Sequence, residues 1–392
     1  MLPYWRLSAY YFFYFAFIGA FSPYFTLYLR SLSFSATEIA LLMSLMQVMR
    51  VLAPNMWGWL AEHLGMRVQI VRLSALMSLI GFSIFFFTVR FDGIFAGMAL
   101  MAFFWSAALP LIEGVTFAHL GGQGHQYGRI RAWGSVGFIA AVIGLGWLLD
   151  FLPISAVLWG IAAVLVGILL SALLVPEAYR PPQGRAVMGF GDTLRRTEVQ
   201  ALLGACFLMA AAHGAFYVFF SILLVENGYD KRVVGALWAL GVLAEILVFL
   251  GMPRLLKRFA LRDILIVAFA CATLRFALTG WGVASLALLA LAQLLHGVTF
   301  GAHHAASIAA VNRWFPGRLQ ARGQALYGSL SFGAGGMLGG LISGYTWDTI
   351  GSAWTFTLGS AFAAAGLAWL LLGWRTQTGD EKDAPLNEER TV

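Results

Sequence analysis

The chain has 392 residues, of which 60% are hydrophobic and 11% are charged, and its formal net charge is +7. Soluble domains carry about 25% charged residues, so this composition excludes an ordinary water-soluble protein and indicates a chain that lies in a lipid bilayer. The positive charge is typical of basic residues in cytoplasmic loops and does not indicate nucleic-acid binding.

Apolar stretches long enough to cross about 30 Å of hydrocarbon recur along the whole chain. The runs are continuous rather than alternating, so they predict helices and not the strands of a barrel. The fold class is therefore all-α integral membrane, with twelve transmembrane helices. Their approximate centres are residues 18, 48, 79, 106, 139, 165, 211, 242, 271, 297, 333 and 363.

A polar connection with two adjacent prolines divides the spans six against six. "RAWGSVGF" (131–138) is similar to "ALYGSLSF" (325–332), about half a chain later, which predicts two pseudo-symmetric six-helix bundles. Most Lys and Arg fall on the side of the N-terminus, so both termini are expected in the cytoplasm. The expected parts are an N-terminal six-helix half (1–175), a cytoplasmic linker (176–198), a C-terminal six-helix half (199–375) and a disordered cytoplasmic tail (376–392).

Two ionisable residues lie deep within spans 2 and 8, at corresponding places in the two halves. Arg50 lies in "LMQVMRVLAP", and Glu245 lies 195 residues later in "GALWALGVLAEILVFLG". A charge at the bilayer centre costs about 2.5–3.5 kcal/mol, so each is a candidate functional residue. We expect Glu245 to carry a proton or bind substrate, and Arg50 to bind an anionic group through bidentate hydrogen bonds. The alternatives are a structural ion pair for either residue and, for Glu245, a neutral acid that is hydrogen-bonded within the protein.

"GWLAEHLGMR" (58–67) joins spans 2 and 3. Its glycines allow tight packing at the helix ends, and its charged residues are placed to latch neighbouring helix termini. We therefore expect a gating or structural element formed by Gly58, Glu62, Gly65 and Arg67.

Three further spans carry candidate site residues. Arg131 opens span 5 in "YGRIRAWGSVGF" and is expected in the cavity, whereas Arg129 fits a loop charge. Arg275, in "CATLRFALTG", either lines the cavity or reaches toward an interface. His296, in "LLHGVTFGAHHAAS", is a candidate proton relay. His303 shares its helical face, but no cysteine or carboxylate follows at ligand spacing, so no metal site is predicted.

The twelve-span, two-half layout resembles the major facilitator superfamily. In that superfamily the loop between spans 2 and 3 reads Gly-x-x-x-Asp-Arg-x-Gly-x-Arg. "GWLAEHLGMR" is similar, with Glu62 in place of the aspartate and His63 in place of the arginine. The resemblance implies a secondary transporter that works by alternating access of two halves.

Within the superfamily the chain resembles the branch that includes lactose permease and the phenylpropionate permeases, in segments such as "YYFFYFAFIGAFSPYF" and "LLHGVTFGAHHAA". Glu113 and Arg131, 18 residues apart, match the acid–arginine pair that contacts sugar in lactose permease. Glu245 matches its span-8 acid and His296 its span-10 histidine. Its proton-carrying acid three residues further on is Thr299 here, so the resemblance implies that Glu245, or else Glu113, carries the proton.

The resemblance to the phenylpropionate permeases implies a proton-coupled symporter of the bacterial inner membrane that imports a small aromatic carboxylate such as phenylpropionate. Trp133, Trp238 and Phe21 are expected to pack against the apolar part of the substrate. A sugar or nucleoside symporter and a drug or metabolite exporter are the alternatives. No phosphate loop, nucleophile elbow or zinc pattern occurs, so no enzyme activity, metal or cofactor is expected. The partners are substrate, protons and lipid, and the chain is expected to act as a monomer.

Overall fold

The structure is a computed structural model that describes residues 2–121, 123, 126–178 and 190–374, apart from the side chains of Asn55, Glu62 and Arg318. Within these ranges, twelve helical spans are long and apolar enough to cross a membrane. Each contains one of the centres predicted from the sequence, so the all-α membrane fold is confirmed. Residues 179–189 of the expected linker, and the expected tail, lie outside the described residues.

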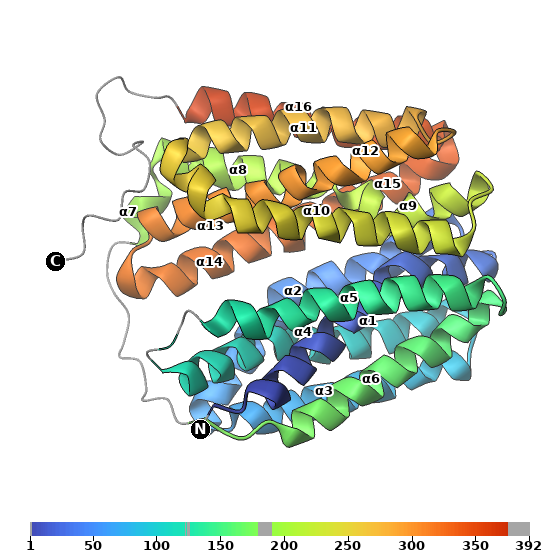
Figure 1. Cartoon of the computed structure of the whole chain (residues 1–392), viewed down its shortest axis with the longest axis horizontal. Coiled ribbons are helices and arrows are strands. Elements are labelled where there is room, and N and C mark those ends of the chain that lie inside the picture. Colours follow the sequence, from blue (N-terminus) through green and yellow to red (C-terminus); the bar gives the residue numbers. More distant parts are fainter. Residues whose placement is uncertain (1, 122, 124–125, 179–189, 375–392) are drawn as a thin grey trace. The chain divides into compact units, whose positions relative to one another are not determined.

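The chain divides into two compact units, of which unit 1 comprises Met1–Gly184 and Tyr217–Ala239. Figure 1 shows the helices coloured along the chain. The segment 217–239 joins unit 1 although it belongs to the second half of the sequence. The helices of unit 1 are α1 (Tyr4–Ser31), α2 (Ala36–Leu64), α3 (Arg67–Ser83), α4 (Phe91–Leu120), α5 (Tyr127–Leu149), α6 (Val157–Leu174), most of α9 (Gly214–Glu226) and the start of α10 (Lys231–Arg258).

Unit 2 comprises Arg185–Phe216 and Leu240–Val392, and therefore contains the remainder of α10. Two of its spans include π-helical segments, at Gly297–Ala302 and Ser329–Gly335. Its other helices are α7 (Phe190–Leu194), α8 (Thr197–Ala212), α11 (Leu261–Trp281), α12 (Leu286–His296), α13 (His303–Trp314), α14 (Gln320–Gly328), α15 (Gly336–Ile350) and α16 (Ser352–Gly373).

Glycines bring the backbones of α1 and α5 into direct contact in unit 1. A Cβ atom at Gly19 would lie 2.5 Å from the carbonyl oxygen of Phe138, and one at Gly137 would overlap the carbonyl group of Phe12. Small residues permit this approach between membrane helices, where van der Waals contact replaces the hydrophobic drive that operates in water. α1 consequently packs along both α5 and α6.

Glycines also bring helix backbones into direct contact in unit 2, where α8 packs against span 11. A Cβ atom at Gly339 would overlap the backbone of Ala211, and one at Gly214 would overlap the peptide group between Gly339 and Gly340. The glycine-rich stretch 333–340 is therefore a helix-packing surface.

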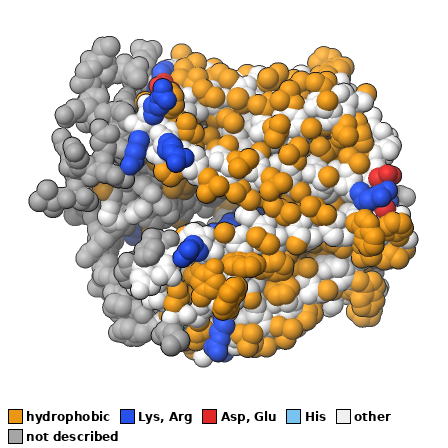
Figure 2. Space-filling view, in the orientation of Figure 1, with side chains coloured by type: hydrophobic (Ala, Val, Ile, Leu, Met, Phe, Trp, Pro, Cys, Tyr) orange, Lys and Arg blue, Asp and Glu red, His pale blue; other side chains and the backbone are white. Residues whose placement is uncertain are grey.

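Apolar side chains cover most of the face shown in Figure 2, with lysines and arginines at the ends of the helices. Large apolar side chains on the outside include Trp159 and Leu247, which are 71% and 69% exposed. In water such a surface would cause aggregation, whereas hydrocarbon solvates it.

We expect Gly339→Ala to destabilise the protein by about 1–3 kcal/mol, because its methyl group would force α8 and α15 apart. The measurement is the midpoint of thermal unfolding in detergent. Gly328→Ala is the matched control in the same span, because nothing lies within 4 Å of a Cβ atom there. Equal midpoints for the two variants would contradict the close contact.

Candidate functional site

The candidate site lies in unit 2, where span 10 changes from α-helix to π-helix. α12 ends at His296, and the π-helix begins at Gly297. A Cβ atom at Gly297 would lie 2.6 Å from the carbonyl oxygen of Ala244, and one at Gly301 would lie 3.4 Å from Cγ of Glu245. Glycines four residues apart therefore form the surface against which α10 packs, and this contact brings Glu245 to span 10.

Glu245 and His296 face one another across this contact. Oε2 of Glu245 lies 3.9 Å from Nε2 of His296, and their side chains are 21% and 8% exposed. A carboxylate forms an ion pair with an imidazole only when the imidazole carries a second proton, whereas a neutral imidazole can still donate its one N–H to the carboxylate. The arrangement therefore places an acid beside a base, between which a proton can pass.

Arg275 lies on α11 with its side chain fully buried. Nε donates to the carbonyl oxygen of Ala292, 3.1 Å away, and Nη1 lies 3.1 Å from Nε2 of His213 and 3.3 Å from Oγ1 of Thr299. The guanidinium carbon lies 4.2 Å from the centre of the Phe216 ring, which adds a cation–π contact. Arg275 thus joins spans 7, 9 and 10, and it does not reach toward an interface.

His213 lies at the break in span 7, between the end of α8 and the start of α9. Its Nδ1 lies 2.8 Å from the carbonyl oxygen of Met209, and its Nε2 faces Nη1 of Arg275. A carbonyl oxygen can only accept and a guanidinium can only donate, so the proton of this imidazole is on Nδ1. The centres of the His213 and His296 rings lie 6.2 Å apart. His213 therefore contacts Arg275 and also lies near the Glu245–His296 pair.

Gln293 precedes His296 by one turn on α12 and is fully buried. Among the described residues, neither polar atom of its side chain has a hydrogen-bond partner, and the same holds for Nδ1 of His296. Burying unsatisfied polar groups costs about 1–3 kcal/mol each, so such groups in a native protein call for an explanation such as a functional role. A fully apolar span would have avoided this cost.

In unit 1 the acid–arginine pair implied by the resemblance comes from two helices, with Glu113 on α4 and Arg131 near the start of α5. Tyr127 donates a 3.0 Å hydrogen bond to Oε1 of Glu113, and Arg131 is close enough to act on Glu113 electrostatically. The guanidinium carbon of Arg131 lies 3.6 Å from the centre of the Phe15 ring. An acid, a phenol and a guanidinium therefore meet beside an aromatic ring.

Arg50 lies on α2 and is half-buried. Its guanidinium carbon lies 6.0 Å from the centre of the Trp105 ring, which itself stacks on Tyr14 at 4.7 Å. Phe21 is buried in the adjoining column of α1 rings, stacked on Phe17 at 5.1 Å. Arg50 belongs to unit 1 and Glu245 to unit 2, and each has close neighbours within its own unit.

The two tryptophans predicted to contact substrate lie in different parts of unit 1. Trp133 donates to the hydroxyl of Tyr4 and lines an apolar groove with Trp5 and Phe12, among others. Trp238 is buried and donates to Oγ of Ser221.

The loop between spans 2 and 3 is short. α2 ends at Leu64 and is followed by Gly65, whose φ of 66° suits glycine, and α3 begins at Arg67. Gly58 lies within α2, and the side chain of Glu62 lies outside the described residues. The contacts that hold this end of unit 1 come from α3 and the end of span 6. Glu177 accepts from the backbone N–H of Val68, and Arg72 donates to backbone carbonyls that include that of Val175.

Among the described residues, no group of three or more His, Cys, Asp or Glu side chains could hold a metal ion. Sequence reasoning missed Gln293, Tyr127 and Glu177. The Gly-x-x-x-Gly spacing at 297–301 is the one signal in the sequence that could have placed α10 against span 10.

A sequence profile of the MFS_1 like family matches residues 4–358. The chain is 27% identical to a protein named probable 3-phenylpropionic acid transporter from Escherichia coli (strain K12), over 87% of this chain and 90% of that protein. It is also 27% identical to maltose permease from Geobacillus stearothermophilus, over 95% of each chain. The putative nucleoside transporter YegT of Escherichia coli (strain K12) is 24% identical over 81% of this chain and 78% of that protein.

Solved structures share the fold. The crystal structure of nucleoside transporter NupG superposes with a TM-score of 0.84 at 17% identity, covering 96% of this chain and all of that one. A POT family peptide transporter superposes with a TM-score of 0.77 at 14% identity, covering 97% of this chain and 98% of that one.

We expect Arg275→Lys to lower the thermal unfolding midpoint in detergent, because an ammonium group cannot reach Ala292, His213 and Thr299 at once. Breaking a buried charged network typically costs about 3–5 kcal/mol. Arg254→Lys, at an exposed position of α10, is the control and should leave the midpoint unchanged. A midpoint for Arg275→Lys as high as that of the control would show that the network does not hold the three spans together.

Proposed function

The chain belongs to the MFS_1 like family of membrane transporters, and we propose that it is a proton-coupled symporter that imports a small aromatic carboxylate such as phenylpropionate by alternating access. The observation that carries the proposal is the Glu245–His296 pair, an acid and a base 3.9 Å apart within two membrane spans.

The proton is carried by Glu245, which is partly exposed and can exchange it, while His296 and His213 act as relays. An ionisable acid at membrane depth is expensive and typically marks a proton or ion pathway. A carboxylate that is neutral when loaded and charged when empty gives the transporter two electrostatic states, which is the requirement for coupling. Glu113 beside Tyr127 is the second acid of this kind.

The anionic group of the substrate is bound by an arginine that lies beside aromatic rings. Arg131 lies against Phe15, and Arg50 lies near Trp105. A guanidinium beside an aromatic face suits a ligand that carries a carboxylate on one side and a ring on the other. Arg275 already donates its hydrogen bonds within the protein, so its role is to position span 10, whichever substrate is bound. Trp133, Trp238 and Phe21 supply the apolar surface against which the aromatic ring of the substrate packs. The probable 3-phenylpropionic acid transporter among the relatives supports this substrate class.

A sugar or a nucleoside is the second candidate substrate. The Glu113–Arg131 pair favours it, because an acid and a guanidinium together suit hydroxyl groups, and the relatives include maltose permease and nucleoside transporters. Export of a drug or metabolite is the third and would appear as resistance of growing cells.

We also propose how the chain is oriented in the membrane and how its parts move, with the orientation taken from the distribution of Lys and Arg. Both termini face the cytoplasm in a bacterial inner membrane, and the chain acts as a monomer. Two six-helix halves, 1–175 and 199–375, move against each other, and the linker 176–198 joins them. The loop with Gly58, Glu62, Gly65 and Arg67 takes part in gating on the cytoplasmic side.

The test is the pH of a weakly buffered suspension of de-energised cells that express the protein, with small aromatic acids, sugars and nucleosides added one at a time. Alkalinisation with aromatic acids alone supports the proposal. Alkalinisation with sugars or nucleosides alone selects the second candidate. With the protein confirmed in the membrane, no response to any class argues against proton symport of these substrates.

We expect Glu245→Gln to abolish accumulation of substrate against a gradient while sparing exchange, because glutamine cannot release a proton. The measurements are uptake of labelled substrate and the pH response above. Asp263→Asn, which removes an exposed acid at the start of α11, should leave both unchanged. Full concentrative uptake by Glu245→Gln would remove Glu245 from the proton pathway.

A further inference from the structure

The first turns of α1 have an inner and an outer face. On the inner face the Tyr11 hydroxyl lies 3.2 Å from that of Thr116 on α4. Tyr14, on the same face, stacks on Trp105 of α4 at 4.7 Å. Positions 5, 8, 9, 12 and 13 have the spacing of a single helical face and lie on the opposite side of α1. Trp5, the first of them, is 70% exposed, so this face is turned outward.

The outer face of α1 is the floor of an apolar groove, and α5 and α6 flank it. A Cβ atom at Gly137 of α5 would overlap the carbonyl group of Phe12, and one at Gly167 of α6 would overlap the ring of Phe13. The groove has a volume of about 210 Å³, several times the roughly 30 Å³ that one water molecule occupies, and its exposed atoms are nearly all apolar. Its lining residues are Trp5, Ser8, Ala9, Phe12, Phe13 and Trp133.

Ser8 is a polar residue within this apolar lining. It is only 2% exposed, and among the described residues its hydroxyl has no hydrogen-bond partner. An unbonded buried hydroxyl costs free energy, so such groups nearly always find an acceptor. Because Ser8 lines the groove, an acceptor on a molecule that lies in the groove can supply the missing bond.

Aromatic side chains lie at the mouth of the groove. The ring centres of Trp5 and Trp133 are 5.7 Å apart, and Nε1 of Trp133 donates to the hydroxyl of Tyr4 at 3.2 Å. That hydroxyl lies 3.5 Å from the carbonyl oxygen of Arg129, so the starts of α1 and α5 lie at the same end of unit 1 (Figure 1). Trp and Tyr gather where hydrocarbon meets the lipid headgroups, so the groove runs from this boundary into the hydrocarbon.

Two arginines flank the mouth of the groove. Arg6 is exposed, and its Nη1 donates at 3.4 Å to the carbonyl oxygen of Leu174, at the end of α6. Arg129 is exposed at the start of α5. Neither α1 nor α5 contains an acidic residue, and Glu177, which follows α6, bonds to the start of α3. The mouth therefore carries net positive charge, which attracts anionic headgroups.

We propose that the groove binds one anionic phospholipid from the leaflet on the side of the N-terminus. One acyl chain lies along Phe12 and Phe13, and the hydroxyl of Ser8 donates to an ester carbonyl oxygen of the lipid. The phosphate lies between Arg6 and Arg129. Ser8 follows Arg6 by two residues and therefore lies about 3 Å deeper along the helix, which matches the order of phosphate and ester groups in a phospholipid. This binding requires only that the chain crosses a bilayer, whatever its substrate and coupling.

In this arrangement Trp133 contacts the lipid. Arg131 and Trp133 are two residues apart on α5, so their side chains point about 160° apart around the helix axis. Trp133 lies against Trp5 on the outer side, and Arg131 points the other way. The surface proposed for the substrate ring is thereby narrowed to Trp238 and Phe21.

The test is lipid binding by the full chain, measured by native mass spectrometry. The protein is purified in detergent, stripped of lipid and titrated with dioleoylphosphatidylglycerol or with dioleoylphosphatidylcholine, which has the same chains and a zwitterionic headgroup. We expect the phosphatidylglycerol to bind about tenfold more tightly, a difference of 1.4 kcal/mol, and equal affinities would overturn the proposal. Glycerol phosphate alone should bind far more weakly. If it binds as tightly as the whole lipid, the arginines form a phosphate site and the groove holds no chain.

Variants separate the groove from other lipid contacts of the protein. Ala9→Phe places a ring in the groove and should weaken phosphatidylglycerol binding about tenfold. Ser8→Ala removes one donor and should weaken it about threefold, the effect of one hydrogen bond. Arg6→Gln combined with Arg129→Gln should remove the preference for phosphatidylglycerol and leave phosphatidylcholine binding unchanged, which misfolding would not do. The thermal unfolding midpoint in detergent checks the fold of each variant.

Two matched controls should leave binding unchanged. Ala140→Phe adds the same ring at an exposed position of α5, two turns further along the helix than Trp133. Arg90→Gln removes an exposed arginine that precedes α4 and is paired with Asp92. The proposal fails if Ala9→Phe binds phosphatidylglycerol as tightly as Ala140→Phe does, or if the double arginine variant keeps its preference for that lipid.

Discussion

A guanidinium group in hydrocarbon has to find its hydrogen-bond partners within the protein, and Arg275 imposes this requirement on three spans. It bonds to Ala292, His213 and Thr299, which belong to spans 10, 7 and 10. The break in span 7 falls at His213, and Thr299 lies within the π-helix of span 10. The irregular backbone in this part of unit 2 thus occurs where the arginine finds its partners, and the Glu245–His296 pair lies at the edge of this network.

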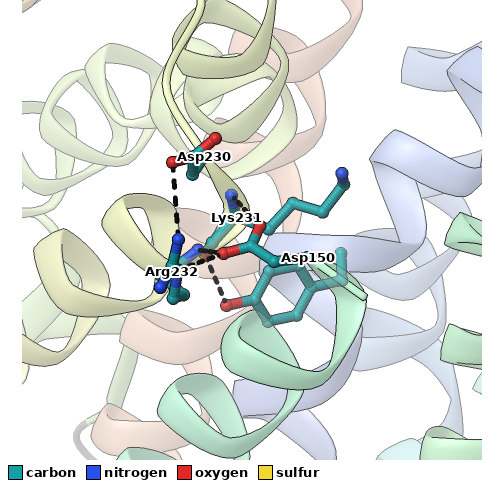
Figure 3. Close-up of polar contacts among 5 residues, drawn as sticks. Asp150, Asp230, Lys231 and Arg232 are labelled. Atoms are coloured by element: carbon teal, nitrogen blue, oxygen red, sulfur yellow. Dashed lines mark hydrogen bonds and ion pairs between the residues drawn. The ribbon is translucent and has the colours of Figure 1, made fainter. Parts of the chain in front are cut away.

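Polar contacts at the helix ends follow a different rule from those in the interior. Glu177 caps the start of α3, and Asp150 caps the start of α10 (Figure 3); the first residue follows α6 and the second follows α5. At a helix end water can replace the carboxylate, so such a bond can break at small cost. The interior network has no water to replace its bonds. Glycine contacts therefore hold the helices of both units together in the interior, with the buried Arg275 network added in unit 2, and the exchangeable contacts lie at the helix ends.

The spans could be predicted from the sequence because crossing hydrocarbon demands about 20 consecutive apolar residues, whatever the tertiary structure. The depth of Glu245 and His296 could be predicted for the same reason, since a polar residue stands out in an apolar run. Their pairing could not, because spacing along the chain does not say which helix faces which. Arg275 shows the limit most clearly. Its two sequence interpretations were the cavity and an interface, whereas its Nε and Nη1 donors are bonded within unit 2. Asp150 and Glu177 were overlooked because a surface carboxylate in the sequence looks the same whether or not it caps a distant helix.

The π-helix of span 10 affects how the side chains of this span can change position during evolution. A π turn holds an additional residue compared with an α turn, and an α-helix rotates by about 100° per residue. Deleting one residue between Gly297 and Ala302 would therefore restore regular geometry and move every later side chain back by one position. His304, now half-buried against Tyr327, would take the fully packed place of His303 beside Cys206. Deleting one codon would in this way turn every side chain in the later half of the span to a new direction while leaving Glu245 and His296 in place, which substitutions could achieve only in many steps.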